Sequence, residues 1–396
     1  MVLSTLTLSH SSALAGAAGS KGMARVLEAN GIALGSAIRD KDFEAVEILL
    51  RHAKEENVDW TTWVDTWGKT FLHEAVLYGD RAIVGFLAEQ GAKVNQPDNQ
   101  GRRPLHLAAE GGKIEAVREL LKYGANANQR DNKGDTPLHI AIAWGKTEVV
   151  RELLKNGANA NHSNFRGLRP LHLAAERSNI EVVRELLKSG ANANQRDKKG
   201  KTPLHYASAE GSTKIVLLLL KYSRNDKREH INKLDYERES PLFCAAERNH
   251  KKIVQLLLKS GANPNLEGRA PILIASMKGH AKIVRLLRKY GADIDCYNRL
   301  RESPLHLASM NGRDLVVRHL LRYGVYAVNV NARDGGHRTA LLYAAAYGHT
   351  KVVKILLENG AKDLPDQTGK TALDHAEKNG KPEAAKMIRK RIQLVD

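Results

Sequence analysis

One 33-residue unit, repeated in register, constrains the fold of this chain more than any other feature. Residues 98–130 read DNQGRRPLHLAAEGGKIEAVRELLKYGANANQR, and residues 131–163 read DNKGDTPLHIAIAWGKTEVVRELLKNGANANHS. A Leu-His pair recurs at intervals of 33 residues, at Leu72, Leu105, Leu138, Leu171 and Leu204. A fixed period of this length is typical of a solenoid, in which each unit packs only on its neighbours.

The period becomes irregular after residue 205, but the pattern continues. Equivalent positions fall at Leu242, Ile272, Leu305, Leu341 and Leu373. A divergent unit without the Leu-His pair precedes them at residues 31–64, and it has the polar outer side that a solenoid end requires. We therefore expect one array of about eleven units over residues 31–391, a flexible leader over 1–30 and a short tail over 392–396. An organelle-targeting peptide and a cryptic signal peptide are the alternatives for the leader.

The residue pattern of each 33-residue unit predicts two short helices followed by a turn. Thr136 is a good N-cap, and Pro137 suits the first helical position. Ala108 and Ala109 keep the first helix small, so that neighbouring units approach closely. The second helix carries an apolar face, and Gly124 follows it as a left-handed stop.

This combination of residues resembles the ankyrin repeat. The matching pattern is Asp-x-x-Gly-x-Thr-Pro-Leu-His, two alanines, Val-x-x-Leu-Leu and Gly-Ala-x-x-Asn, and it covers residues from about 31 to 391. The resemblance implies an all-α solenoid of stacked antiparallel helix pairs with hairpin loops at one edge. It also implies a concave groove of hairpin tips and first helices that binds other proteins, and no catalysis.

The resemblance also gives the repeated histidines a structural role. In that family this histidine forms hydrogen bonds within its own loop and ties one tip to the next. Histidines 33 residues apart lie on successive repeats rather than around one ion, and no Cys, Asp or Glu converges with them at ligand spacing. The set comprises His73, His106, His139, His172, His205 and His306.

Several units depart from the pattern. Arg103 and Arg169 replace the capping Thr, which predicts a loss of about 1 kcal/mol of helix stability at each site. Residues 223–239 replace the usual hairpin with a longer charged loop, and the tip near 266–269 is three residues short. The hairpin lengthens again between residues 324 and 331.

The sequence contains no complete motif for catalysis or nucleotide binding. Gly-Lys-Thr occurs four times, but no copy has the glycine five residues earlier that a phosphate loop needs. Of the two cysteines, Cys244 takes the place of an apolar core residue, and Cys296 falls near a loop tip, where a surface thiol is expected. We predict no enzyme, no cofactor and no metal site.

The net charge of +18 is uneven. Residues 1–198 hold 26 Lys and Arg against 24 Asp and Glu, a balance of +2, whereas residues 199–396 hold 36 against 20, a balance of +16. Lys199 to Arg301 alone carries 21 basic and 10 acidic residues. A solvated outer face explains this charge, and the alternative function is electrostatic binding of nucleic acid or an anionic surface. Few aromatic residues lie among these basic residues, so the sequence gives little support for stacking on nucleic acid bases.

Recognition residues need not repeat, so we sought them at positions that vary between units. By family geometry the tip and the end of the first helix face the groove, and Trp, Tyr and Arg are enriched in binding hot spots. The candidate partner-binding residues are Trp67, Tyr78, Arg102, Glu110, Asp135, Trp144, Phe165, Arg177, Lys201, Glu210, Arg248 and Tyr347.

The predicted function is a scaffold or adaptor that binds partner proteins, acidic ones among them. We expect a monomer without a transmembrane segment, because no apolar run approaches the ~20 residues that span a bilayer. We expect it in the cytoplasm, with the nucleus as the alternative.

Overall fold

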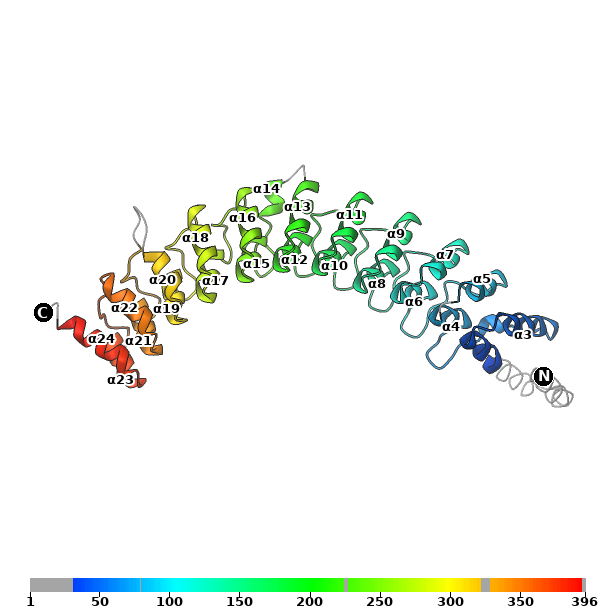
Figure 1. Cartoon of the computed structure of the whole chain (residues 1–396), viewed down its shortest axis with the longest axis horizontal. Helices are drawn as coiled ribbons and strands as arrows, with labels where there is room; N and C mark the ends of the chain where they lie inside the picture. The colour runs from blue at the N-terminus through cyan, green and yellow to red at the C-terminus, as the bar shows by residue number, and fades with distance from the viewer. Residues whose placement is uncertain (1–30, 79, 224–226, 322–327, 394–396) are drawn as a thin grey trace. The chain divides into compact units, whose positions relative to one another are not determined.

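A computed structural model describes residues 31–78, 80–223, 227–321 and 328–393 (Figure 1). The chain divides into two compact units, here called unit 1, up to Asn192, and unit 2, from Ala193 onward. Each unit is described by itself. The predicted leader and the start of the lengthened hairpin at 324–331 lie outside the described residues.

Unit 1 is a stack of antiparallel helix pairs. Its first pair is a helix over residues 31–40 followed by α3 (Phe43–Glu55). The later pairs are α4 (Phe71–Tyr78) with α5 (Arg81–Glu89), α6 (Pro104–Gly111) with α7 (Ile114–Lys122), α8 (Pro137–Ala143) with α9 (Thr147–Lys155), and α10 (Pro170–Glu176) with α11 (Ile180–Lys188). A 3-10 turn, η1 (Trp60–Thr62), joins the first two pairs, and Trp63 stacks on Phe71 at 4.1 Å between ring centroids.

Unit 2 repeats this arrangement. Its pairs are α12 (Pro203–Ala209) with α13 (Thr213–Tyr222), α15 (Pro241–Glu247) with α16 (Lys251–Lys259), α17 (Pro271–Lys278) with α18 (Ala281–Lys289), α19 (Pro304–Met310) with α20 (Asp314–Leu321), α21 (Ala340–Tyr347) with α22 (Thr350–Glu358), and α23 (Ala372–Lys378) with α24 (Pro382–Ile392). Within each unit, first helices pack on first helices and second helices on second helices. This confirms the all-α solenoid, and the described residues contain no strand.

The local signals act as predicted. Thr136 caps α8 by accepting a hydrogen bond from the His139 amide, and Pro137 occupies the first helical position. Ala108 and Ala109 are fully buried in α6, where neighbouring first helices meet. Small side chains at this contact allow the close approach on which the stack depends.

The histidines tie neighbouring tips together, as the resemblance implied. The His139 ring accepts a hydrogen bond at Nδ1 from the Thr136 amide, and its Nε2 donates to the Leu168 carbonyl of the next tip at 3.1 Å. His73, His106, His205 and His306 make the corresponding contacts within their units. Burial lowers the pKa of all five rings, so they are neutral at pH 7.

Two departures from the repeat differ from prediction. The segment at 223–239 is not only a charged loop, because it contains the short helix α14 (Lys227–Ile231), whose His230 and Ile231 are fully buried. Arg103 lacks the capping hydroxyl, but its Nη1 donates to the carbonyls of Gly101 at 2.8 Å and Arg130 at 2.6 Å. A threonine cannot make these bonds, so they offset part of the predicted loss.

Candidate protein-binding surface

Four aromatic side chains of unit 1 stand out in solvent. Trp67 is 66% exposed and Phe165 56%, both at hairpin tips, while Trp144 is 58% and Tyr78 40% exposed at the ends of first helices. Large apolar side chains that remain this exposed mark interaction sites when they gather on one surface. Trp67 and Tyr78 belong to the α4–α5 repeat, Trp144 follows α8, and Phe165 lies in the tip before α10, so they form two groups with the α6–α7 repeat between them. We call these four residues the aromatic surface of unit 1.

The tips hold these side chains on a fixed backbone. Asp131 accepts hydrogen bonds from the amides of Lys133 and Asp135, both at 2.8 Å. The Phe165 ring lies over Gly134 of the preceding tip, where a β carbon would come within 2.8 Å of the ring. Gly134 also has a φ of +79°, so glycine is needed there twice over.

At the ends of the repeats opposite the hairpin tips, asparagines form hydrogen bonds that link neighbouring repeats. Asn128 donates from Nδ2 to the Gly157 carbonyl at 3.0 Å, and its Oδ1 accepts from the Asn159 amide at 2.7 Å. Asn95 and Asn161 make the same two bonds. These hydrogen bonds satisfy backbone groups that follow each second helix and link each repeat to the next.

Three charged candidates of unit 1 are engaged locally. Arg102 pairs with Asp98 at 3.2 Å and with Glu110 at 3.3 Å, and only 22% of its side chain is exposed. Asp135 is half-buried and accepts a hydrogen bond from Asn164 at 2.8 Å. A partner would have to break these contacts, so they offer less binding energy than the aromatic surface.

The structure corrects the register of one candidate. The sequence pattern places Glu110, like Trp144, at the end of the first helix, directly before a glycine. The glycine that ends this helix is Gly112, with φ +69°, so Gly111 takes the position of Trp144, and Glu110 aligns with Ala143. The doubled glycine in the sequence allowed both alignments. Arg177 does hold the predicted position, and it is exposed.

The candidates of unit 2 are less uniform. Lys201 is half-buried and lies 3.6 Å from Asp235 and 3.7 Å from Glu239. Glu210 and Arg248 are exposed and face each other at 3.8 Å. Tyr347 is exposed and stacks with His349.

Sequence reasoning missed three exposed residues at the tips of unit 2. They are Tyr236, Tyr297 and Leu300. Tyr236 could have been found, because it occupies the tip position of Phe165 and its ring lies over Gly200 in the same way. The irregular spacing after residue 205 hid this equivalence.

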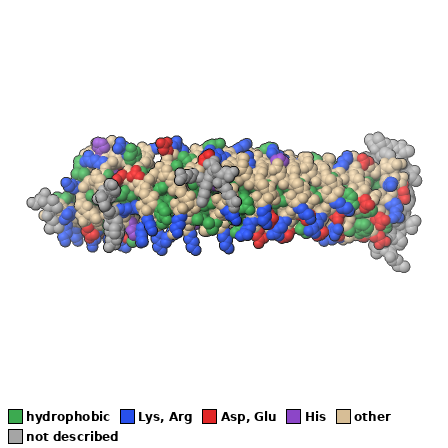
Figure 2. Space-filling view, turned by 90° about the horizontal axis from the view of Figure 1, so that it is seen from above, with side chains coloured by type: hydrophobic (Ala, Val, Ile, Leu, Met, Phe, Trp, Pro, Cys, Tyr) green, Lys and Arg blue, Asp and Glu red, His purple; other side chains and the backbone are tan. Residues whose placement is uncertain are grey.

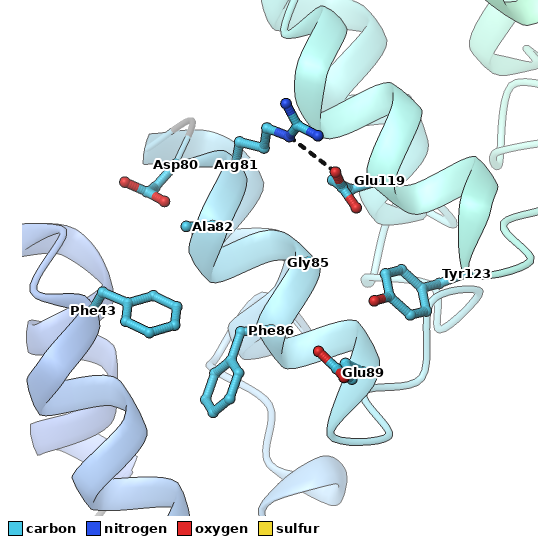
Figure 3. A pocket seen from close by; sticks show the side chains of 9 residues that line it. All are labelled: Phe43, Asp80, Arg81, Ala82, Gly85, Phe86, Glu89, Glu119 and Tyr123. Carbon is cyan, nitrogen blue, oxygen red and sulfur yellow. Dashed lines mark hydrogen bonds and ion pairs between the residues drawn. The ribbon is translucent and has the colours of Figure 1, made fainter.

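A separate hollow of about 560 Å³ lies among the second helices of unit 1 (Figure 3). Phe43 from α3, Phe86 from α5 and Tyr123 after α7 line it, and Arg81 pairs with Glu119 at its edge at 2.9 Å. It is open and shallow, and it contains no predicted site residue. Among the described residues, no three His, Cys, Asp or Glu side chains converge as metal ligands would.

These observations define a repeat solenoid whose hairpin tips and first-helix ends present variable side chains. A sequence model of ankyrin repeats, described as three copies, matches residues 20–98, 93–164, 158–229, 223–298, 242–334 and 305–395. The chain belongs to the ankyrin repeat family. Ankyrin repeats are generally protein–protein interaction modules and are typically non-enzymatic. No curated protein matches the chain significantly. None of the described helices is long and apolar enough to cross a membrane.

Proposed function

We propose that this chain is a protein-binding scaffold or adaptor that holds its partner on the aromatic surface of unit 1. The observation that carries this proposal is the exposure of Trp67, Trp144 and Phe165, each more than half accessible on a rigid repeat. Trp and Tyr side chains dominate the energetics of many interfaces because they bury a large area with few rotatable bonds.

The exposed area is large enough to matter. A fully buried aromatic side chain covers about 150–250 Å². Burying the exposed 58% of Trp144 therefore removes about 130 Å² from water, which contributes about 3 kcal/mol at 25 cal/mol per Å². Trp144 and Phe165 belong to neighbouring repeats, so one partner segment would reach both.

The remaining candidates play lesser parts in this proposal. Arg177 is exposed and would steer the partner, whereas Arg102, Glu110 and Asp135 support the tips through their local contacts. In unit 2, the exposed Tyr347 and Tyr236 are candidates for a contact of that unit's own. The cytoplasm is the compartment we propose for this scaffold.

The test compares proteins captured from the source cell extract by three forms of the full chain. The forms are wild type, Trp144→Ala with Phe165→Ala, and the control Tyr222→Ala. Tyr222 is 47% exposed on α13, away from the tips, so it matches the loss of an exposed aromatic residue.

We expect the double variant to lose a partner that wild type and control retain, with an affinity loss of about 100-fold or more. Circular dichroism should show unchanged helicity, because both side chains are exposed. Equal retention of the partner by all three forms would reject the aromatic surface as the binding site.

A further inference from the structure

Three positions of each second helix point outward, and they allow units 1 and 2 to be compared directly. These positions are the second, fifth and ninth of the helix, which share one face because a helix turns 100° per residue. In α7 they are Glu115, Arg118 and Lys122. In α9 and α11 they are again Glu, Arg and Lys.

In unit 1 the charges of each of these helices balance, because α7, α9 and α11 each hold two Glu against one Arg and one Lys, and the arginines of α7 and α9 are paired. Arg118 contacts Glu115 of its own helix at 2.8 Å and Glu152 of the next at 3.2 Å. Arg151 pairs in the same way with Glu148 and Glu181. The face is therefore a lattice of surface ion pairs, which holds few charges ready for a ligand.

The same face of unit 2 is cationic. The three adjacent helices α13, α16 and α18 contain no acidic residue. Their exposed basic residues, which we call the cationic face, are Lys214, Lys221, Lys251, Lys252, Lys259, Lys282, Arg285 and Lys289. In the described part of the chain, none of these eight is within ion-pair distance of an acidic side chain.

The distribution of charged side chains on the surface agrees with this comparison of α13, α16 and α18 with α7, α9 and α11. Figure 2 shows blue side chains without red ones along one edge over α13, α16 and α18, and blue mixed with red along the part that holds α5 to α11. The substitutions are position-specific, since Lys214, Lys252 and Lys282 stand where unit 1 has Glu115, Glu148 and Glu181.

Exposed leucines accompany the lysines. Leu217, 50% exposed, takes the fifth position of α13, where α7, α9 and α11 have arginine. Leu315, 60% exposed, takes the second position of α20, next to α18. No leucine occupies an outward position of α7, α9 or α11. Unit 2 thus carries both positive charge and exposed leucines on the face where unit 1 has ion pairs.

We propose that the cationic face, with Leu217 and Leu315, docks unit 2 on an anionic phospholipid surface. Clusters of four to eight Lys or Arg bind anionic headgroups, and flanking apolar side chains enter the boundary between headgroups and acyl chains. A nucleic acid backbone would use the basic residues but gains nothing from the two leucines. Arg285 is the single arginine among the eight residues of the cationic face, and Tyr222 at the end of α13 is one exposed aromatic side chain beside it, whereas base recognition typically uses arginine forks and several aromatic platforms. The phospholipid surface accounts for both the lysines and the leucines.

The test measures binding of the full chain to vesicles of phosphatidylcholine with about 30% phosphatidylserine, to pure phosphatidylcholine vesicles and to a DNA duplex of about 30 base pairs. Lys214→Glu, Lys252→Glu and Lys282→Glu together restore the residues of unit 1. The matched control reverses the exposed lysines Lys113, Lys133 and Lys155 of unit 1, and so changes the net charge equally. A third form carries Leu217→Gln and Leu315→Gln.

We expect binding to the anionic vesicles only. Each cation near such a surface contributes about fivefold, so the triple reversal should weaken binding by about 100-fold or more. The control should change it less than about threefold, and the leucine variant should weaken it by about tenfold.

Two results would overturn the proposal. One is absent vesicle binding, or binding reduced equally by the triple reversal and its control. The other is duplex DNA binding that the triple reversal removes while vesicle binding stays insensitive to both leucines, which would assign the cationic face to nucleic acid.

Discussion

Acid should destabilise both units through the buried histidines. The His106 ring accepts a hydrogen bond from the Arg103 amide and donates one to the Asp135 carbonyl at 3.1 Å. His205 is held in the same way by Thr202 and Glu239. A second ring proton would point at an amide N–H, so protonation breaks the contact as well as burying a charge.

The size of the effect follows from the pKa values. Burial lowers the pKa of His106 and of His205 from 6.5 to about 4. Because the folded value lies below the unfolded one, the unfolded chain takes up the proton first as the pH falls. The stability from each ring is complete above pH 6.5 and is lost between about pH 6.5 and 4. At pH 5 each ring should cost about 2 kcal/mol relative to pH 7.5.

The assay is urea unfolding of the wild type and of His205→Gln, followed by circular dichroism at pH 7.5 and pH 5. Glutamine keeps a donor but does not titrate, and Phe243 at the same position of the next repeat shows that the helix forms without histidine. The variant should be less stable than wild type at pH 7.5, and the difference should shrink by about 2 kcal/mol at pH 5. An unchanged difference between the two pH values would refute the assignment of His205 as a buried neutral ring.

Three further predictions concern single side chains. His337 is exposed and has a φ of +60°, at a tip position where most repeats have glycine. Because this left-handed conformation strains any residue with a β carbon, His337→Gly should raise the free energy of unfolding by about 1 kcal/mol in urea titrations, and His337→Ala should not. Ser276 is buried and its hydroxyl has no described partner, so Ser276→Ala should stabilise by about 1 kcal/mol; a loss would reveal a hidden hydrogen bond. Burial raises the pKa of Cys244 and of Cys296 to about 12, so neither thiol should react with a disulfide reagent within minutes at pH 7.5 in the folded chain, whereas both should react in urea.

The fold was predictable because each signal acts locally and recurs. The N-cap at Thr136, the proline that follows it and the tip-to-tip histidine occupy the same positions in many repeats. Cys244 was likewise predicted to be a core residue, and the structure confirms it. Cys296 was expected at the surface, but it is half-buried.

The candidate site was harder to predict, because exposure depends on neighbours that sequence spacing does not reveal. From the sequence, Arg102 and Trp144 are equally suited to binding. In the structure, however, Arg102 forms ion pairs with Asp98 and Glu110. Tyr236 was missed because an insertion changed the count, although its backbone position is that of Phe165. Variable positions therefore indicate a binding site only when the ion pairs and hydrogen bonds of each side chain are also known.

The charge of the second helices shows how one scaffold can separate folding from binding. The buried positions are alike in both units: Val117 and Leu120 of α7 correspond to Val254 and Leu257 of α16. Ion pairs such as Arg118 with Glu152 are worth at most about 1 kcal/mol each, so their loss in unit 2 costs little folding energy. The outward positions are therefore free to change charge while the helices stay in place. For the same reason, restoring glutamate in unit 2 should leave the fold intact, and any loss of binding then reports on the surface alone.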